Sequence, residues 1–110
     1  MRSKIHKARV TKTNLNYEGS IGIDRALTKK VDFRPGEKVL VVDNTNGSRI
    51  ETYIIEEKEN SGNIVIYGGA AHLIKKGDEV IIMGFEMTNK QLKPKSILVN
   101  KKNRFVKYLF

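Results

Sequence analysis

The chain has no cysteine among its 110 residues, and no apolar run that approaches the length of a membrane span. The first absence excludes disulfides, thiolate metal ligands and a cysteine nucleophile, and it suits a reducing compartment. The second indicates that no segment spans a membrane. The opening MRSKIHKARV alternates basic with apolar residues, which is not typical of a cleavable export signal. We therefore expect one cytoplasmic domain covering residues 1–110.

Acidic residues are absent after Glu86, and the chain carries a net charge of +9. The basic residues beyond that position are Lys90, Lys93, Lys95, Lys101, Lys102, Arg104 and Lys107. A positive balance attracts anions of several kinds, including nucleic acids and small carboxylates. Charge alone does not choose among them, and a solvated basic face is the simplest interpretation.

Metal-ligand clusters and phosphate-binding loops are missing as well. The two histidines, His6 and His72, lie far apart, and neither has a second ligand at a familiar spacing. The stretch YGGAAH lacks the lysine and the helix start that a glycine-rich phosphate loop requires. We therefore expect no metal site, and we expect the backbone at 67–72 to pass close to another part of the chain or to a substrate.

Strand-like segments make up most of what is present. Short apolar or alternating runs bounded by turn signals occupy residues 4–11, 38–43, 49–57, 63–68, 79–85, 96–100 and 104–110. One short helix is predicted over residues 24–31, with Asp24 as its cap. The pair Asn46-Gly47 predicts a hairpin turn that needs positive φ. Several closely spaced strands predict a mainly β fold, either a small barrel or a sandwich.

The pair Gly19-Ser20 lies between two extended segments, and its simplest role is to turn the chain. A serine hydroxyl close to the preceding carbonyl can also attack it and convert the amide to an ester, and glycine tolerates the strained backbone this needs. Elimination from the ester leaves dehydroalanine, which hydrolyses to a ketone with loss of ammonia. The product is a pyruvoyl group at the start of the downstream fragment.

Several motifs surround this pair in a defined order along nearly the whole chain: KIHKARVTKTNLNYEGSIGID, TNGSRIETYII, GGAAHLIKKGDEVIIMGF and LKPKSILVNKKNR. The most specific parts are Lys-x-His at the start, Tyr-x-Gly-Ser at 17–20 and Thr-Asn-Gly-x-Arg-x-x-Thr-Tyr at 45–53. Together they resemble the aspartate 1-decarboxylases, pyruvoyl enzymes that make β-alanine for pantothenate biosynthesis.

The resemblance implies a six-stranded double-psi β-barrel with short helices, assembled as a homotetramer with active sites between subunits. It implies cleavage between Gly19 and Ser20 into a chain of residues 1–19 and a chain of residues 20–110. The second chain would begin with the pyruvoyl group derived from Ser20, which forms a Schiff base with L-aspartate. An accessory maturation protein remains a possible further partner.

The resemblance also assigns roles by position. Thr52 would assist processing, and Tyr53 would be the proton donor after decarboxylation. The implied substrate-binding residues are Lys4, Arg49, Thr52, Gly68, Gly69 and Ala70, and His6 and Tyr17 would line the site. These residue types suit the chemistry, because a ketone that condenses with the substrate amine provides an electron sink, and a phenol can return a proton to the carbanion. Arginine holds a carboxylate in a bidentate way, and lysine adds a point charge.

Two features leave the assignment of the site open. Where the family usually reads Asn-Gly-Ala-Ala-Ala-His, this chain reads YGGAAH, so the phenol of Tyr67 replaces an amide near the expected pyruvoyl group. Strict strand alternation puts Thr52 on the opposite face from Arg49 and Tyr53. A bulge, or contributions to different neighbouring sites, would reconcile these positions.

Two other functions compete with the decarboxylase. The chain could be a basic β-barrel that binds nucleic acid, with Phe105 and Tyr108 interleaved with Arg104 and Lys107, although a C-terminal strand with a buried face explains these residues equally well. It could also be an inactive family member that stays unprocessed because of Tyr67. We favour decarboxylation of aspartate, and we expect nucleic acid not to be the partner.

Overall fold

The computed structural model describes residues 1–109 and is built mainly of strands, with one α-helix and one 3₁₀ helix. The strands are β1 (Ser3–Arg9), β2 (Lys12–Asn14), β3 (Ser20–Asp24), β4 (Lys38–Asp43), β5 (Arg49–Glu57), β6 (Ile64–Tyr67), β7 (Glu79–Gly84), β8 (Lys95–Val99) and β9 (Phe105–Tyr108). The helices are α1 (Arg25–Val31) and η1 (Gly68–His72). The strands form one nine-stranded sheet in the order β2-β6-β3-β5-β4-β7-β1-β8-β9.

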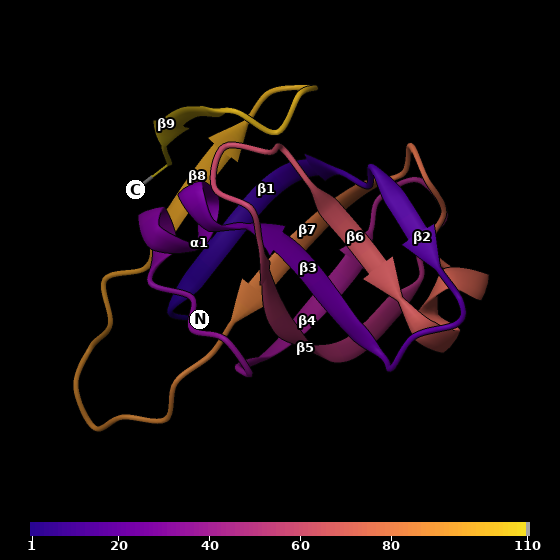
Figure 1. Cartoon of the computed structure of the whole chain (residues 1–110). Coiled ribbons are helices and arrows are strands. Elements are labelled where there is room, and N and C mark those ends of the chain that lie inside the picture. Colours follow the sequence, from indigo (N-terminus) through magenta and orange to yellow (C-terminus); the bar gives the residue numbers. More distant parts are fainter. Residues whose placement is uncertain (110) are drawn as a thin grey trace.

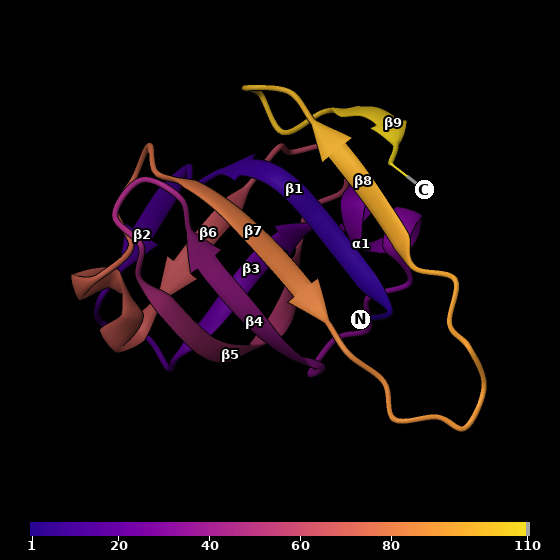
Figure 2. The same cartoon turned by 180° about the vertical axis from the view of Figure 1, so that it is seen from behind.

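The sheet closes because its N-terminal segment takes part at two places. β1 pairs antiparallel with β7, and β2, which follows it directly in the chain, pairs parallel with β6. One segment thus joins both ends of the row β6-β3-β5-β4-β7, and the strands curve around a common core (Figure 1, Figure 2). The predicted mainly β fold, a small barrel with short helices, is confirmed. The β8–β9 hairpin lies outside this ring, beside β1 and α1 (Figure 1).

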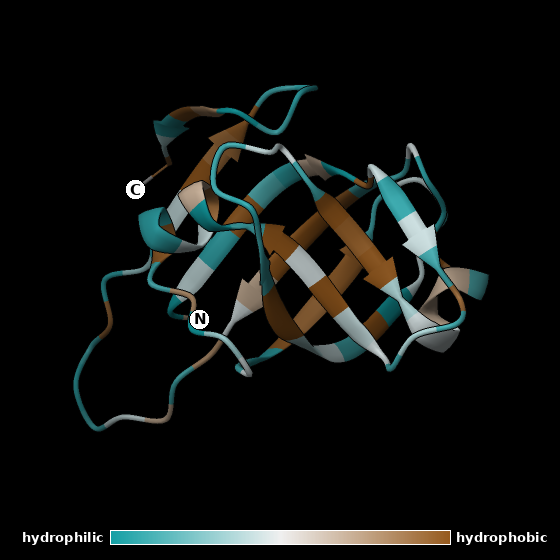
Figure 3. Cartoon of the chain, in the orientation of Figure 1, coloured by the Kyte–Doolittle hydropathy of each residue, from teal (hydrophilic) through white to brown (hydrophobic). Residues whose placement is uncertain are grey.

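Register decides which side chains enter the core. Ile5 pairs with Ile82, and Val41 pairs with the same Ile82, so the three side chains point to one face of adjacent strands. All three are fully buried. Burying one such side chain contributes roughly 1.5–3 kcal/mol. The hydropathy colouring of the barrel strands shows the same concentration of apolar residues (Figure 3).

Helix α1 follows β3 directly and begins as the sequence predicts. The Asp24 carboxylate accepts a hydrogen bond from the Ala26 N–H at 2.8 Å, which is an N-cap. The helix ends at Asp32, which adopts φ 59° in the left-handed region. Leu27 and Val31 are buried and belong to the core cluster.

Several predicted elements are confirmed and two differ. β4 and β5 have the predicted bounds, and Gly47 has φ 81° in the predicted turn. The strand predicted over 4–11 ends earlier, at Arg9, and its register shifts between Ile5 and Ala8, where Lys7 has φ 65°. The separate strand β2 was not predicted. Phe110, the last residue of the predicted 104–110 strand, lies outside the described residues. Among residues 1–109, no helix is long and apolar enough to cross a membrane.

Candidate active site

Ser20 begins β3 and is only 2% exposed, although the five residues before it are exposed. Its neighbours in the sheet are β6, which runs antiparallel and pairs Ser20 with Tyr67, and β5, which runs parallel. The Ser20 hydroxyl donates to the Glu18 carbonyl at 3.3 Å. The hydroxyl is therefore turned back along the segment that leads into the Gly19-Ser20 bond.

Gly68 packs closely against this segment, as the sequence suggested for residues 67–72. It has φ +79°, and a Cβ at this position would lie 2.8 Å from the Gly19 Cα. Only glycine combines this backbone conformation with such a close approach at low cost. Gly69 differs, since a Cβ there would meet nothing within 4 Å. Ala70 is half-buried and packs against the core.

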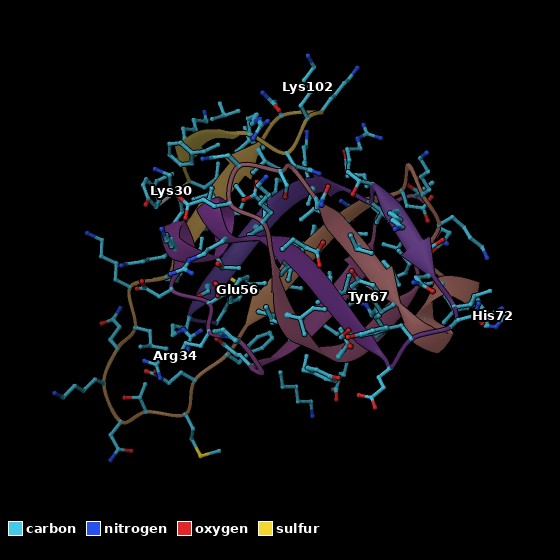
Figure 4. The ribbon with its side chains drawn as sticks, viewed as in Figure 1. Lys30, Arg34, Glu56, Tyr67, His72 and Lys102 are labelled. Carbon is cyan, nitrogen blue, oxygen red and sulfur yellow. The ribbon has the colours of Figure 1, made fainter. Side chains whose placement is uncertain are left out.

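Tyr67 lies on the same side of the sheet as Ser20, because paired residues of antiparallel strands project to one face. Its hydroxyl donates to Glu57 Oε2 at 3.1 Å, and its ring lies 4.9 Å from the Tyr17 ring, centroid to centroid. Burial raises the pKa of the Tyr67 phenol, and the hydrogen bond to Glu57 raises it further. The phenol therefore keeps its proton at neutral pH. Figure 4 shows Tyr67 at the end of β6, with His72 projecting from η1 beyond it.

Gly22 leaves the space in which Glu57 meets Tyr67. A Cβ on Gly22 would lie 2.5 Å from Glu57 Oε2, so the carboxylate covers the glycine backbone. Glu57 was not singled out in the sequence, because its side chain reaches Tyr67 only through the register of three strands. The signal that could have indicated this contact is the glycine in the middle of β3. Ser20, Gly22 and Asp24 point to one face of the strand, and a glycine there leaves room for a larger side chain from a neighbouring strand.

Tyr53 is the predicted proton donor, and strand register places it beside Ser20. β3 and β5 pair Ile21 with Ile54, so the residues that precede them, Ser20 and Tyr53, are neighbours on adjacent strands. Both apolar partners are fully buried, and Ser20 and Tyr53 therefore project from the outer side of the wall. Tyr53 is 37% exposed.

Thr52 projects to the other side of β5. It pairs with Val39, a buried core residue, whereas Arg49 and Tyr53 are exposed. The pairing of β4 with β5 runs without a register shift from Arg49 to Tyr53. The bulge that would turn Thr52 to the face of Arg49 and Tyr53 is therefore not found in this pairing.

Lys4 and Arg49 are not brought to Ser20 within one chain. In the order β3-β5-β4-β7-β1, three strands separate β1 from β3, so strand pairing does not make Lys4 a neighbour of Ser20. Arg49 is four residues from Tyr53 along β5, or about 13 Å at about 3.3 Å per residue. Both lie on the outer face, since Lys4 pairs with Met83, Met83 with Leu40, and Leu40 with Glu51.

His6 lies two residues beyond Lys4 on β1 and is half-buried. Burial lowers the pKa of its imidazole, and the nearby charges of Lys4 and Lys7 lower it further. The ring is therefore neutral near pH 7. Its Nδ1 is buried without a hydrogen-bond partner among the described residues. No group of three His, Asp or Glu side chains within residues 1–109 is placed to hold a metal ion.

Of the basic residues after Glu86, Lys90 and Lys93 lie in the loop between β7 and β8, and the others lie on the β8–β9 hairpin. The Phe105 ring packs against Tyr108 at 5.2 Å between centroids, and Lys30 Nζ lies 4.4 Å from the Phe105 centroid. Figure 4 shows Lys30 on α1 beneath this hairpin and Lys102 at its tip. The aromatic rings thus contact one another and a cation of the same chain. The buried face predicted for this C-terminal strand is wrong, because all four residues of β9 are exposed.

The structure is thus a small closed barrel in which a buried serine, Ser20, follows a glycine that packs against the turn at Gly68. A sequence profile described as aspartate decarboxylase matches residues 1–106. The chain is 51% identical over 108 residues to an aspartate 1-decarboxylase of Thermosipho africanus, covering 96% of this chain and 90% of the relative. It is 45% identical over 108 residues to that of Pseudothermotoga lettingae, covering 96% and 94%.

A third relative, an aspartate 1-decarboxylase of Staphylococcus aureus, is 44% identical over 113 aligned positions, covering 99% of this chain and 89% of the relative. The similarity therefore extends over almost the full length of both partners in each case. The chain belongs to the aspartate decarboxylase family, a family of carboxy-lyases. The predicted resemblance is confirmed.

Proposed function

We propose that this protein decarboxylates L-aspartate to β-alanine and CO₂ for pantothenate biosynthesis in the cytoplasm, after cleaving itself between Gly19 and Ser20. The products would be a chain of residues 1–19 and a chain of residues 20–110 that carries a pyruvoyl group. Membership of the aspartate decarboxylase family supports the reaction. The observation that supports self-processing is the buried Ser20, whose preceding glycine lies under the turn at Gly68.

The processing step balances with one molecule of water. The Ser20 Oγ attacks the Gly19 carbonyl carbon, the C–N bond breaks, and the Ser20 nitrogen takes up the proton. Loss of the Ser20 Cα proton expels the Gly19 carboxylate and leaves dehydroalanine. Addition of water and release of ammonia then give the ketone. The Ser20 hydroxyl donates to the Glu18 backbone carbonyl, so it is directed toward the residues that precede the bond to be cleaved.

The residues around Ser20 fit a bound pyruvoyl group, which supplies an electron sink to the substrate's α-carbon. Tyr53 adjoins Ser20 through the β3–β5 register and can donate a proton from its phenol. Arg49 and Lys4 would hold the substrate carboxylates, and the net positive charge would draw the anionic substrate toward them. Thr52, Gly68, Gly69, Ala70, His6 and Tyr17 keep the supporting roles that the family resemblance implies.

The positions of the cations support a homotetramer with active sites between subunits. Strand pairing places neither Lys4 nor Arg49 beside Ser20 in the same chain. Both lie on the outer face of the sheet, which also carries half-buried apolar residues such as Leu40 and Met83. A second copy packed on this face would cover those residues and bring its own cations near Ser20.

Intact mass under denaturing conditions tests the proposal. Two fragments separated at Gly19-Ser20 are expected, and the larger should be lighter by one ammonia than the same fragment with N-terminal serine. Ser20→Ala should abolish cleavage and CO₂ release from aspartate. Ser96→Ala is the matched control, because Ser96 is also a buried serine, its hydroxyl has no hydrogen-bond partner among residues 1–109, and it lies on β8.

A single full-length species that persists on warming would contradict the proposal. Cleavage that appears only when cell extract is added would instead point to an accessory maturation protein. Salt-sensitive binding to single-stranded nucleic acid by an uncleaved chain would favour the competing function of a basic barrel.

A further inference from the structure

We infer that Tyr67, held by Glu57 across Gly22, is a positioning residue that aligns the Gly19-Ser20 bond for self-processing. This inference rests on the proposed function. It adds to the same site two residues that act indirectly, through the segment before Ser20. Neither residue would touch the reacting atoms. Tyr67 would instead fix the exposed segment that leads into Ser20.

The anchor is the contact between Tyr67 and Glu57. The phenol donates to Glu57 Oε2 at 3.1 Å, and the other carboxylate oxygen accepts from the Asn63 side-chain amide at 3.5 Å. The carboxylate lies over Gly22, where any Cβ would collide with it. Charge-assisted hydrogen bonds of this kind are stronger than neutral ones. The Tyr67 ring is therefore held at its hydroxyl end by groups that belong to the barrel wall.

The other end of the anchor is the segment before Ser20. The Tyr67 ring packs on the Tyr17 ring, and Tyr67 pairs with Ser20 in the sheet. The next residue, Gly68, approaches both Gly19 and the Tyr17 carbonyl, to which a Cβ at Gly68 would lie 3.1 Å. Tyr67, the last residue of β6, and Gly68, the first of η1, thus contact three of the four residues 17–20.

These contacts matter because residues 15–19 are all exposed and Tyr17 is 57% exposed. An exposed segment has many conformations, and attack by a hydroxyl on a neighbouring carbonyl needs one narrow arrangement of the two. Packing on a fixed ring removes conformations that cannot react. The raised pKa of Tyr67 supports this role, since the neutral phenol remains a hydrogen-bond donor to Glu57 at physiological pH.

The experiment measures the rate of cleavage of the full chain, made by cell-free synthesis at low temperature, then warmed and followed by intact mass. Tyr67→Phe keeps the ring and removes the hydroxyl, and Glu57→Ala removes the acceptor. Each should slow cleavage on the order of tenfold. Glu57→Gln should restore most of the rate, because its amide oxygen can still accept from the phenol. The double variant Tyr67→Phe with Glu57→Ala should be no slower than the slower single variant.

Two controls separate positioning from loss of folding. Tyr108→Phe removes a phenol hydroxyl from β9, where it donates to the Lys30 carbonyl at 3.1 Å, and should leave cleavage unchanged. In a Ser20→Ala background, near-UV circular dichroism reports on tyrosine and phenylalanine alone, because the chain has no tryptophan. Glu57→Ala should change that spectrum and Glu57→Gln should not.

The outcomes distinguish the two proposals. A wild-type chain that never cleaves would overturn the proposed function, and the role of Tyr67 with it. A wild-type chain that cleaves, together with Tyr67→Phe and Glu57→Ala chains that cleave at the same rate, would overturn the positioning role alone. Additive slowing in the double variant would also contradict it, because the two residues would then act separately. Should Glu57→Ala fail to fold, Tyr67→Phe still decides.

Discussion

Strands β3 and β9 belong to the same sheet but differ most strongly in how far they are buried. β3 is buried at all five of its positions, whereas β9 is exposed at all four. Their sequences suggest otherwise, because SIGID holds a serine, a glycine and an aspartate, and FVKY holds two aromatic residues and a valine. The strand that carries the proposed reaction thus has the smaller share of apolar residues and is the better enclosed.

The difference arises from what borders each strand. β3 is paired on both edges, with β5 and β6, and its outer face is covered by side chains such as Glu57, which lies over Gly22. β9 is paired only with β8 and lies outside the ring of the barrel (Figure 2). The burial of these two strands therefore follows the number of strands that border each one, and not its share of apolar residues.

Truncating one aliphatic side chain in each strand should give the largest contrast in stability. Ile21→Ala in β3 removes a fully buried side chain that packs among strands on both sides, and it should destabilise the fold by roughly 2–5 kcal/mol. Val106→Ala in β9, where the side chain is 50% exposed, should cost less than about 0.5 kcal/mol. Urea unfolding of both variants in a Ser20→Ala background measures this without interference from cleavage. Equal losses would mean that the hairpin is part of the cooperative core.

Substitution in the turn at Gly68, which packs against the residue before β3, should lower the stability nearly as much. Gly68→Ala places a Cβ in the left-handed region and against Gly19, which should cost on the order of 1–3 kcal/mol and slow processing by displacing the segment before Ser20. Gly69→Ala, at the next position, adds a Cβ that meets nothing within 4 Å. Thermal unfolding and intact mass should therefore separate these adjacent variants. A normal cleavage rate in Gly68→Ala would show that this close approach is unimportant for processing.

Local patterns predicted much of the fold. The run KVLVVD and the longer RIETYIIEE became β4 and β5, and Asp24 caps the helix that follows it. Such signals are carried by residues adjacent in the chain, so periodicity and capping rules detect them. The short β2 was missed, because its residues Lys12–Asn14 form a strand only through their pairing with β6. Asp24 likewise accepts hydrogen bonds from the N–H groups of Asn60 and Gly62, which no local rule predicts.

The candidate site divides in the same way. Gly19, Ser20 and Tyr53 were found from motifs, and the register of β3 with β5 makes the last two neighbours. Tyr67 was noticed only as a departure from the family pattern, and its partner Glu57 was not noticed at all. Their contact depends on three strands and on the absence of a side chain at Gly22. Sequence alone cannot supply such a register before the strand order is known.

A buried carboxyl on β4 should make the stability of the barrel, which holds β3 in place, depend on pH. This effect should be smaller than those of the two preceding substitutions. Asp43 is fully buried, and burial raises the pKa of its carboxyl, with a further rise from its contact with Asp78. Its Oδ1 accepts from the N–H groups of Thr45 and Asn46, while Oδ2 has no partner among the described residues unless it carries a proton. The folded state therefore favours the protonated acid.

The sign of the effect follows from linkage. A folded-state pKa above the ordinary 3.8 gives a stabilisation that is complete below that value and is lost as the pH rises through the raised pKa. Asp43→Asn keeps an oxygen acceptor and a donor toward Asp78, and it does not ionise. The stability of the wild type relative to this variant should therefore fall as the pH is raised, measured by urea unfolding in a Ser20→Ala background. A constant difference between pH 4 and 8 would contradict a raised pKa.

The smallest effect is expected from removing one hydroxyl on β9. Tyr108 is 48% exposed and donates to the Lys30 carbonyl at 3.1 Å, so water can replace this hydrogen bond in the Tyr108→Phe variant. The contacts of its ring with Phe105 are kept, and the loss of stability should be below about 0.5 kcal/mol. Tyr67→Phe removes the same atom beside β3, where the phenol is half-buried and its acceptor is a carboxylate, and it should cost more. Equal losses of stability in the two variants would mean that the cover over β3 is no tighter than the packing of the hairpin, which would undo the contrast between these strands.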